Sequence, residues 1–230
     1  MKLSDFKAVF FDFGDTLAGL SPSREELFAR AARATGLELE IEPVRRAYAT
    51  VDFHTKYSSI HITNREDFYH NYNRQLCEAL GVSSYFERLN PVLVAHFQQN
   101  KRWVLFNDAA STLQRLRGRG IRLALVANWD SNLGTLTAEL GIRELFSAIV
   151  SSEEAGVEKP DPAIFRRAAE NLALALEVDR VLYVGNEYRA DVLGARSAGL
   201  TPVLIDRNRL YKHADCLSFP SLGQWLDAVW

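Results

Sequence analysis

The chain has 230 residues, of which 47% are apolar and 24% are charged, and its formal net charge at pH 7 is −2. This composition is that of a globular protein with an ordinary apolar core. The near-neutral charge argues against a nucleic acid or an anionic membrane as a partner. Apolar runs such as Ala8–Phe11 and Leu123–Ala127 have the length of strands and are far too short to cross a bilayer.

Residues 1–7 lack the basic start and the apolar stretch of a secretory signal peptide. The two cysteines, Cys77 and Cys216, have neither a zinc-binding nor a redox spacing, and we expect both to be reduced and buried. We therefore expect a cytoplasmic protein. At this length the chain forms one large domain or a domain that carries an insertion.

The first expected element is a buried strand at Ala8–Phe11. All of its residues are apolar and a glycine follows at Gly14, whereas a strand with one solvated face would alternate polar and apolar residues. A short continuous apolar run is typical of a parallel sheet that helices cover on both faces.

The segment from about Leu20 to Leu105 contains no convincing β-branched run and shows helical spacing instead. A connecting loop of this length does not fit inside a compact domain. We predict a helical cap over residues 20–105, inserted after the first strand of a core formed by residues 1–19 and 106–230. Its expected helices are Arg24–Thr35, Glu42–Val51, Arg65–Leu80 and Tyr85–Gln99, with a break or kink near Pro91.

Apolar runs and helical patterns alternate in the rest of the chain. This alternation predicts an α/β fold with a doubly wound, parallel, five-stranded sheet of the Rossmann-like type. The further strands are expected at Ile121–Ala127, Ala148–Ser151, Val181–Val184 and Thr201–Ile205. The helices between them are expected from Asn107 or Asp108 to Leu116, from Ser131 to Leu140, from Asp161 to Leu172 and from Ala190 to Ala198.

The chain ends in an amphipathic pattern, with Leu222, Leu226 and Val229 on one face and Trp225 and Trp230 nearby. Such a helix either packs on the sheet or forms a dimer contact.

Polar residues follow each of the first four core strands, where ligands bind in open α/β sheets. Taken singly, each has an ordinary explanation as a turn, a cap or a solvated side chain, but together they favour a functional site. They are Asp12, Gly14, Asp15 and Thr16 after the first strand, Asn128, Trp129 and Asp130 after the second, Lys159 after the third, and Gly185, Asn186 and Asp191 after the fourth.

This pattern resembles the haloacid dehalogenase superfamily of hydrolases, in its C1-capped, phosphatase-type branch. The similar segments are FFDFGDTL at Phe10–Leu17, LVANWD at Leu125–Asp130, GVEKPDPAIF at Gly156–Phe165 and YVGNEYRADVLGARSAGL at Tyr183–Leu200. Their order and spacing cover essentially the whole core, and the helical insertion lies where the family places its cap. The third segment is the most specific of the four.

The resemblance implies a hydrolase that acts on a small phosphorylated substrate. Asp12 would be the nucleophile and would form an aspartyl-phosphate that water then hydrolyses. Thr16 and Asn128 would hydrogen-bond the phosphate oxygens, and Lys159 would hold Asp12 and neutralise charge at the phosphoryl group. Trp129 directly follows the second strand and either touches the substrate or packs in the core.

The resemblance also implies bound Mg²⁺, a cation that prefers oxygen ligands. Asp12, the carbonyl group of Gly14 and the side-chain oxygen of Asn186 would hold the cation. Asp191 would contact it directly or through another ligand.

Three positions depart from the family pattern. Gly14 stands where a second aspartate normally protonates the leaving group, a contribution worth ~10²–10⁴-fold in rate. Asp15 is the adjacent candidate for that role, although a shift of one residue in a tight turn normally redirects a side chain. Ala127 replaces a Ser or Thr that would bind phosphate, and Asn186 replaces an aspartate, which weakens metal binding. We therefore expect a slow phosphatase that favours good leaving groups.

Two other interpretations stay open. A 2-haloacid dehalogenase would use Asp12 to attack carbon without a metal, and that branch also lacks the second acid. Arg24 and Arg30 could then bind a carboxylate, although surface salt bridges are the more ordinary explanation for both. The spacing between Asn186 and Asp191 argues for the phosphatase. A non-catalytic binding or regulatory module would also explain the departures, but it would need neither the nucleophile nor the lysine.

Aromatic and histidine residues gather in the expected cap, where helical packing explains most of them. The alternative is that the segment His54–His61 determines specificity by reaching over Asp12. The gathered residues are His54, Tyr57, His61, Tyr69, His70 and Tyr72. The sequence predicts neither the substrate nor the choice between a monomer and a homodimer.

Overall fold

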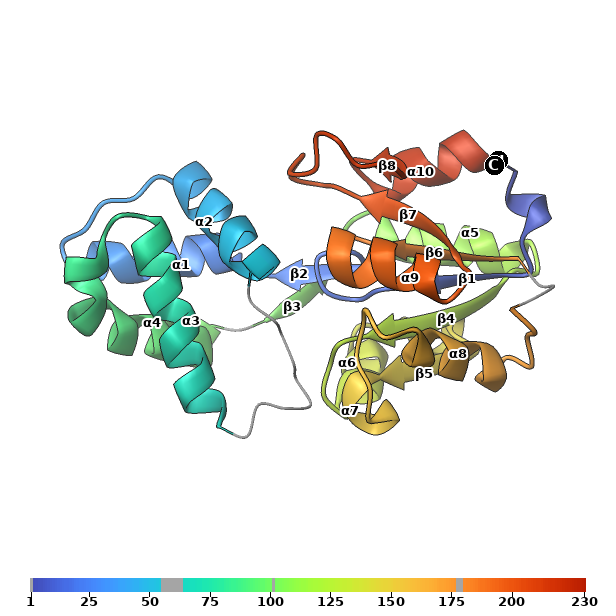
Figure 1. Ribbon diagram of the computed structural model, residues 1–230, viewed down its shortest axis with the longest axis horizontal. Helices are drawn as coiled ribbons and strands as arrows, with labels where there is room; N and C mark the ends of the chain where they lie inside the picture. Colours follow the sequence, from blue (N-terminus) through green and yellow to red (C-terminus); the bar gives the residue numbers. More distant parts are fainter. Residues whose placement is uncertain (1, 55–63, 101, 177–179) are drawn as a thin grey trace. The chain divides into compact units, whose positions relative to one another are not determined.

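The computed structural model describes residues 2–54, 64–100, 102–176 and 180–230, and their contacts divide the chain into two compact units. The core unit consists of Met1–Gly19 and Leu105–Trp230, and the helical unit consists of Leu20–Val104 (Figure 1). The expected boundary placed Leu105 in the insertion, whereas in the structure it groups with the core. Residues 55–63, which include Tyr57 and His61, lie outside the described part of the chain.

A parallel sheet of six strands forms the centre of the core unit, in the order β5-β4-β1-β6-β7-β8. Its strands are β1 (Ala8–Phe11), β4 (Arg122–Ala127), β5 (Ala148–Ser151), β6 (Val181–Gly185), β7 (Thr201–Ile205) and β8 (Leu217–Phe219). The predicted α/β class and the five predicted strands are confirmed, but the sheet has a sixth strand, β8, that was not predicted. The edge strand β8 was missed because its three residues are largely exposed and form no continuous apolar run.

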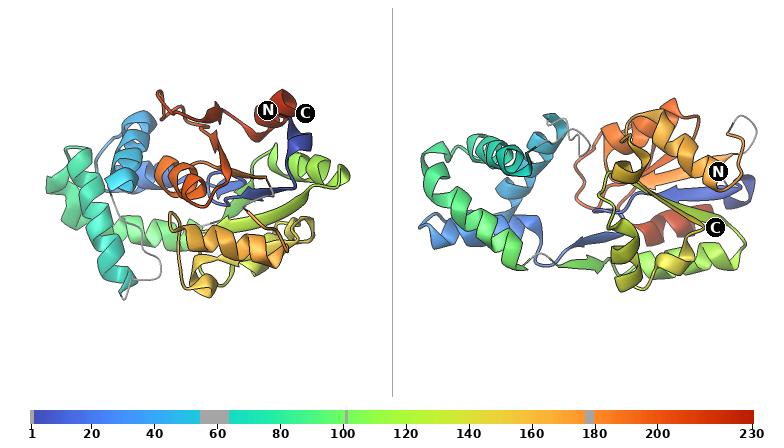
Figure 2. Two further views of the ribbon diagram at one scale, coloured as in Figure 1. Left: turned by 45° about the vertical axis from the view of Figure 1, so that its right-hand side comes forward. Right: turned by 90° about the horizontal axis from the view of Figure 1, so that it is seen from below.

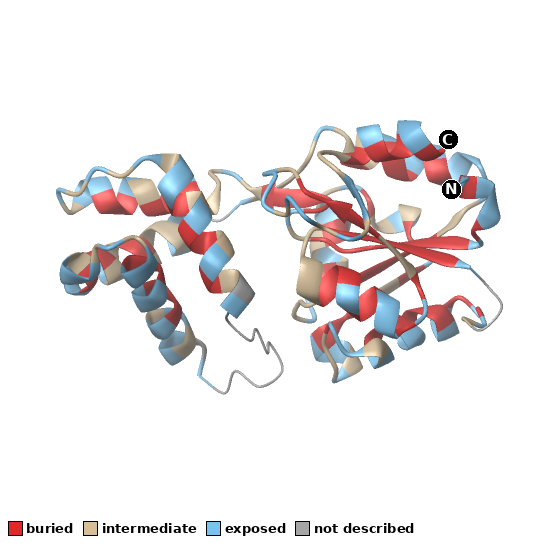
Figure 3. Ribbon diagram, turned by 45° about the horizontal axis from the view of Figure 1, so that its top comes forward, coloured by how far each residue is buried: buried red, intermediate tan, exposed pale blue. Residues whose placement is uncertain are grey.

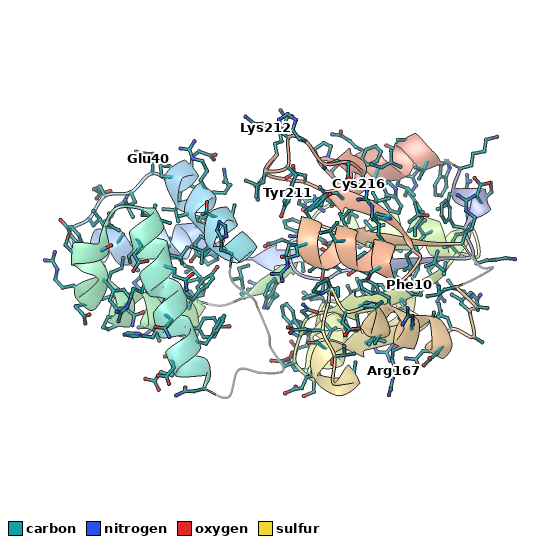
Figure 4. All side chains as sticks on the ribbon, in the orientation of Figure 1. Phe10, Glu40, Arg167, Tyr211, Lys212 and Cys216 are labelled. Atoms are coloured by element: carbon teal, nitrogen blue, oxygen red, sulfur yellow. The ribbon has the colours of Figure 1, made fainter. Side chains whose placement is uncertain are left out.

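Helices cover both faces of this sheet, and the two further views in Figure 2 show the layers. The core helices are α5 (Ala109–Gly118), α6 (Leu133–Glu139), α7 (Ser152–Ala155), α8 (Pro162–Asn171), α9 (Gly194–Ser197) and α10 (Leu222–Val229), with short 3₁₀ turns at Leu3–Asp5 and Arg143–Leu145. Neighbouring residues of β1 point to opposite faces. Phe10 (Figure 4) joins the cluster formed with α8 and α9. The Phe11 ring lies 6.0 Å from that of Trp225 in α10.

The terminal helix α10 packs on the core through Leu222, Trp225, Leu226 and Val229, all of which are buried. This is the first of the two explanations that the amphipathic pattern allowed. Apart from the edge strand β8, the strands of the core sheet are buried along most of their length, and the helices are buried on one side only (Figure 3).

The helical unit contains α1 (Arg24–Ala34), α2 (Ile41–His54), α3 (Arg65–Ala79), a 3₁₀ turn at Ser83–Tyr85 and α4 (Phe86–Asn100). Its first helix begins with a capping box, because Ser23 accepts a hydrogen bond from the Glu26 backbone and the Glu26 side chain accepts one from Ser23. Helix α4 continues through Pro91 rather than ending there. The interior of the helical unit is a cluster of apolar and aromatic side chains that includes Cys77.

Two short strands, β2 (Ala18–Leu20) and β3 (Trp103–Leu105), pair with each other where the chain passes between the units. Both cysteines are free. Cys77 is buried as expected, but Cys216 is only half-buried (Figure 4). Within the described residues, no helix combines the length and the apolar character that a membrane span requires.

Candidate active site

The polar residues after the core strands come together because the strands are parallel and their carboxyl ends share one edge of the sheet. Asp12 directly follows β1, Asn128 follows β4 and Asn186 follows β6, while Lys159 lies between α7 and α8. The hydrogen bonds among them show that the predicted residues form one site.

Lys159 is the centre of this site. Its Nζ donates hydrogen bonds to Asp12 Oδ1 at 2.6 Å and to Asp191 Oδ1 at 2.7 Å. Only 4% of Lys159, 7% of Asp12 and 1% of Asp191 is exposed. Two carboxylates therefore share one ammonium group in a region from which water is largely excluded.

This burial changes the proton affinities of the site. Burial raises the pKa of Asp12 to about 6, because the opposing attraction of Lys159 is partly cancelled by the neighbouring Asp191 carboxylate. Burial alone lowers the pKa of Lys159, but the carboxylates of Asp12 and Asp191 outweigh it and raise that pKa above its ordinary value. Lys159 is therefore charged, and Asp12 ionises nearer to neutrality than an exposed aspartate.

Tyr183 of β6 completes the buried group and was missed by the sequence analysis. Its hydroxyl accepts a hydrogen bond from Lys159 Nζ at 2.9 Å and lies 2.9 Å from the carbonyl oxygen of Val126 and 3.1 Å from Asp191 Oδ1. Burial raises the pKa of Tyr183, so its hydroxyl stays protonated. The one available signal was a polar aromatic residue inside an otherwise apolar strand.

Asp191 lies on a π-helical turn, Tyr188–Leu193, a conformation often found at functional sites. Its Oδ2 accepts hydrogen bonds from the backbone amides of Asn186 at 2.9 Å and Glu187 at 2.8 Å. A Cβ atom at Gly185 would lie 2.4 Å from the Asp191 carboxyl group. Only glycine allows this close approach, which identifies Gly185 as a structural requirement of the site.

Asp191 Oδ1 contacts Lys159 and Tyr183, and Oδ2 contacts the two backbone amides. Direct binding of a cation would have to compete with these hydrogen bonds. The geometry therefore favours the indirect one of the two roles predicted for Asp191, in which it positions Lys159 and the loop that carries Asn186.

Oxygen atoms converge on the other side of Asp12. Thr16 Oγ1 lies 3.0 Å from Asp12 Oδ2 and 3.1 Å from the amide of Asn186. The same end of that amide lies 3.2 Å from Asp12 Oδ2 and 3.0 Å from the carbonyl oxygen of Gly14. If the Asn186 oxygen points toward Asp12 Oδ2 and the Gly14 carbonyl oxygen, three oxygens face one another. If the Asn186 NH₂ group points there instead, it donates hydrogen bonds to these two oxygens.

With the Asn186 oxygen turned toward Asp12 and Gly14, the arrangement fits Mg²⁺; with the NH₂ group there, the site is hydrogen-bonded without a cation. Oxygens bound octahedrally to Mg²⁺ lie roughly 3 Å from their neighbours, and a carboxylate, a carbonyl and an amide oxygen are suitable ligands. The described residues contain no group of three or more His, Cys, Asp or Glu side chains that could hold a metal. The candidate ligand set does not need one, because Gly14 contributes a backbone oxygen and Asn186 an amide.

Asn128 was predicted to hydrogen-bond phosphate oxygens, but in the structure its side chain contacts the backbone of Lys159. Its amide binds the backbone of Lys159 at both ends, accepting from the peptide nitrogen at 2.7 Å and donating to the carbonyl oxygen at 2.9 Å. Asn128 thus fixes the loop that presents the lysine, while contact with phosphate stays a prediction.

Trp129 lies beside Phe13, the residue after Asp12, with the two rings 5.1 Å apart, and its Nε1 donates a hydrogen bond to Asn132. It is half-buried, and this position is compatible with both of its predicted roles. Asp15 has a left-handed backbone with φ of 58°, and its side chain is exposed, whereas Asp12 is buried. Its role as a substitute acid stays a prediction.

Known proteins share this sequence pattern and fold. The family model of the haloacid dehalogenase-like hydrolases matches residues 6–199. Human haloacid dehalogenase-like hydrolase domain-containing protein 3 is 33% identical over 204 residues, which are 85% of this chain and 80% of that protein. Glyceraldehyde 3-phosphate phosphatase of Methanopyrus kandleri is 30% identical over 213 residues, which are 88% of this chain and 85% of that protein.

A solved L-2-haloacid dehalogenase has a similar fold, with a TM-score of 0.67 and 19% identity over 98% of this chain and 99% of that chain. The family match covers most of the chain, and both relatives are similar over most of their length. The chain is therefore a member of the haloacid dehalogenase-like hydrolase family.

Proposed function

We propose that the protein is a Mg²⁺-dependent phosphatase that hydrolyses a small phosphorylated metabolite through an aspartyl-phosphate at Asp12. The observation that carries this proposal is the buried contact of 2.6 Å between Lys159 Nζ and Asp12 Oδ1. A buried charge pair often costs stability, so its presence here favours a role in function. The relative named as a phosphatase supports the same reaction class.

In this reaction a carboxylate oxygen of Asp12 attacks phosphorus, and the bond between phosphorus and the ester oxygen breaks. Water then attacks the aspartyl-phosphate, which releases inorganic phosphate and regenerates Asp12. Lys159 holds the carboxylate in position and offsets the negative charge of the phosphoryl group. Thr16, Asn128 and Trp129 are the proposed contacts to the substrate.

Asp12, Gly14 and Asn186 would hold the cation, and Asp191 would support them by fixing the loop of Asn186. Bound Mg²⁺ would supply positive charge that orients the phosphate oxygens and stabilises the transition state. Because Asn186 contributes no negative charge, the affinity for Mg²⁺ is expected to be lower than with an aspartate there.

The leaving group receives no proton from position 14, because Gly14 has no side chain. Alkyl phosphates are therefore expected to react slowly, with water or the exposed Asp15 supplying the proton. Aryl phosphates need less help because their leaving groups are more stable as anions.

The test is turnover of p-nitrophenyl phosphate with Mg²⁺ and with EDTA. We expect Mg²⁺-dependent release that Asp12→Asn abolishes and that Asp5→Asn, a change to an exposed aspartate, leaves intact. Asn186→Asp should reduce the Mg²⁺ concentration that gives half-maximal activity by about tenfold, because it adds a negative charge to the ligands. Turnover that survives Asp12→Asn would rule the mechanism out.

A 2-haloacid dehalogenase is the second candidate, because its reaction would need no second acid at the position of Gly14. Release of chloride from 2-chloropropionate in EDTA would support it. A binding or regulatory module without catalysis is the outcome if neither assay shows turnover. A cytoplasmic location, and a monomer or homodimer as the working form, belong to the same proposal.

A further inference from the structure

The helical unit contains a cavity of about 440 Å³ that belongs entirely to that unit. Pockets for small organic molecules have this size and are predominantly apolar. Half of the lining residues are aromatic: Tyr48, Tyr69, Tyr72, Phe97 and Trp103. A solvated surface would not gather so many rings, and these walls suit a planar apolar ligand.

Arg24 is the charged residue of the lining, and its charge is already balanced. Its Nη1 lies 2.8 Å from Asp52 Oδ2, its Nε lies 3.3 Å from Glu25 Oε1, and its guanidinium group lies 4.5 Å from the centre of the Tyr48 ring. The hydroxyl group of Tyr72 donates to the same Asp52. The cavity therefore does not require an anionic ligand, and these contacts also argue against Arg24 as the carboxylate-binding residue of a dehalogenase.

Asn73 is the buried polar residue of the lining, whereas Gln98 is exposed. The Nδ2 of Asn73 donates to Asn90 Oδ1 at 2.8 Å, which orients the amide. Among the described residues no group donates a hydrogen bond to Asn73 Oδ1. An amide oxygen accepts hydrogen bonds, so a molecule in the cavity that carries a donor group could pair with Asn73 Oδ1.

We propose that this cavity binds an uncharged, planar, apolar small molecule with one hydroxyl or amino group that donates to Asn73 Oδ1. The aromatic walls contact the faces of the ligand, and Asn73 selects the donor group. None of the lining residues takes part in the phosphatase proposal, so this inference does not depend on it.

The test is calorimetric titration of the full chain with 2-naphthol and with 2-methoxynaphthalene. The two probes have similar rings, but only the first can donate a hydrogen bond. We expect 2-naphthol to bind at least tenfold more tightly. This comparison uses the unmodified protein. Equal affinities, or no binding of 2-naphthol, would overturn the proposal.

Variants then locate the site. Asn73→Leu should remove the preference for 2-naphthol, whereas Asn90→Ala should retain it because the Asn73 oxygen remains. Val94→Trp fills part of the cavity and should weaken both probes at least tenfold, whereas Gln99→Trp places the same ring on an exposed position of α4 outside the lining. Unchanged binding in Asn73→Leu and Val94→Trp would place the probes elsewhere and contradict the proposal.

Discussion

The two units of this protein bury polar groups in opposite ways. The core unit encloses Asp12, Lys159 and Asp191 almost completely, although two carboxylates there compete for one ammonium group. In the helical unit, Arg24 and Asp52 keep 29% and 22% of their side chains exposed and form a balanced pair. The interior of that unit is mostly apolar and aromatic, with Glu25 and Asn73 as its buried polar residues among those described.

The difference shows what each unit is built for. Removing charges from water costs more than their mutual attraction returns unless the geometry is excellent, and a pair that stays partly hydrated avoids most of that cost. The core site thus gives up stability to keep three charged groups together, which is the cost expected of the catalytic role proposed for it. The helical unit leaves the Arg24–Asp52 pair partly hydrated and avoids most of this cost.

The largest expected effect is that of Lys159→Met. This change leaves two buried carboxylates without a counter-ion, and we expect the free energy of unfolding at pH 7 to fall by about 3–5 kcal/mol. Urea unfolding measures it. The loss should shrink at pH 5, where the Asp12 carboxylate can take up a proton. A change below about 1 kcal/mol would show that the site is better hydrated than its burial implies.

The second prediction concerns the pH dependence of stability in EDTA. The pKa of Asp12 is about 6 in the folded protein against an ordinary value of 3.8, so between these values the folded state binds the proton and the unfolded state has released it. The free energy of unfolding should therefore fall as the pH rises from about 4 to about 6, by up to about 3 kcal/mol from this group.

Asp12→Asn should remove that slope and make the protein more stable than the parent at pH 7, while abolishing turnover. Asp5→Asn serves as the control, because Asp5 is exposed and should leave the slope unchanged. A variant that loses stability at pH 7 would contradict the idea that the nucleophile is held at a cost.

Much of the core site could be predicted because its chemistry is local in sequence. Asp12, Thr16, Lys159 and Asn186 were placed by strand ends and motifs, and the structure brings them together. Their catalytic roles stay predictions. Asp108 shows the limit of local reasoning. Asn107 or Asp108 was expected at the start of α5, and Asp108 is the N-cap residue, but its carboxylate makes no capping hydrogen bond there. It instead accepts hydrogen bonds from Arg207 and from the backbone amides that begin α10.

Other features depend on three dimensions. The role of Tyr183 follows from strand register, since β6 pairs with β1 and places Tyr183 opposite Phe10, on the face where Lys159 lies. The π-helical turn that carries Asp191 resembles an ordinary helix in sequence. The cavity of the helical unit was also invisible, because helical periodicity shows which residues turn inward but not how completely they fill the space.

The third prediction is Tyr183→Phe, which removes one hydroxyl group and keeps the ring. Lys159 loses one of three acceptors and Asp191 loses a donor, so we expect a loss of about 1–3 kcal/mol in stability and a fall of roughly tenfold in kcat from a shift of the lysine. Tyr85→Phe in the helical unit is the control and should leave kcat unchanged. A normal kcat in Tyr183→Phe would reduce the hydroxyl to a packing role.

The smallest expected effect is that of Asp52→Asn in the helical unit. This change weakens the pair with Arg24, but both side chains remain in contact with water and the guanidinium group stays over the Tyr48 ring, so the free energy of unfolding should change by less than about 1 kcal/mol. Glu38→Gln, which breaks a still more exposed pair with Arg33, should change it by less again. Urea unfolding of both variants beside Lys159→Met compares the two units directly. If Asp52→Asn cost as much as Lys159→Met, partial exposure would not explain the difference between the two units. The contrast between the buried charges of the core unit and the partly exposed charges of the helical unit would then have to be abandoned.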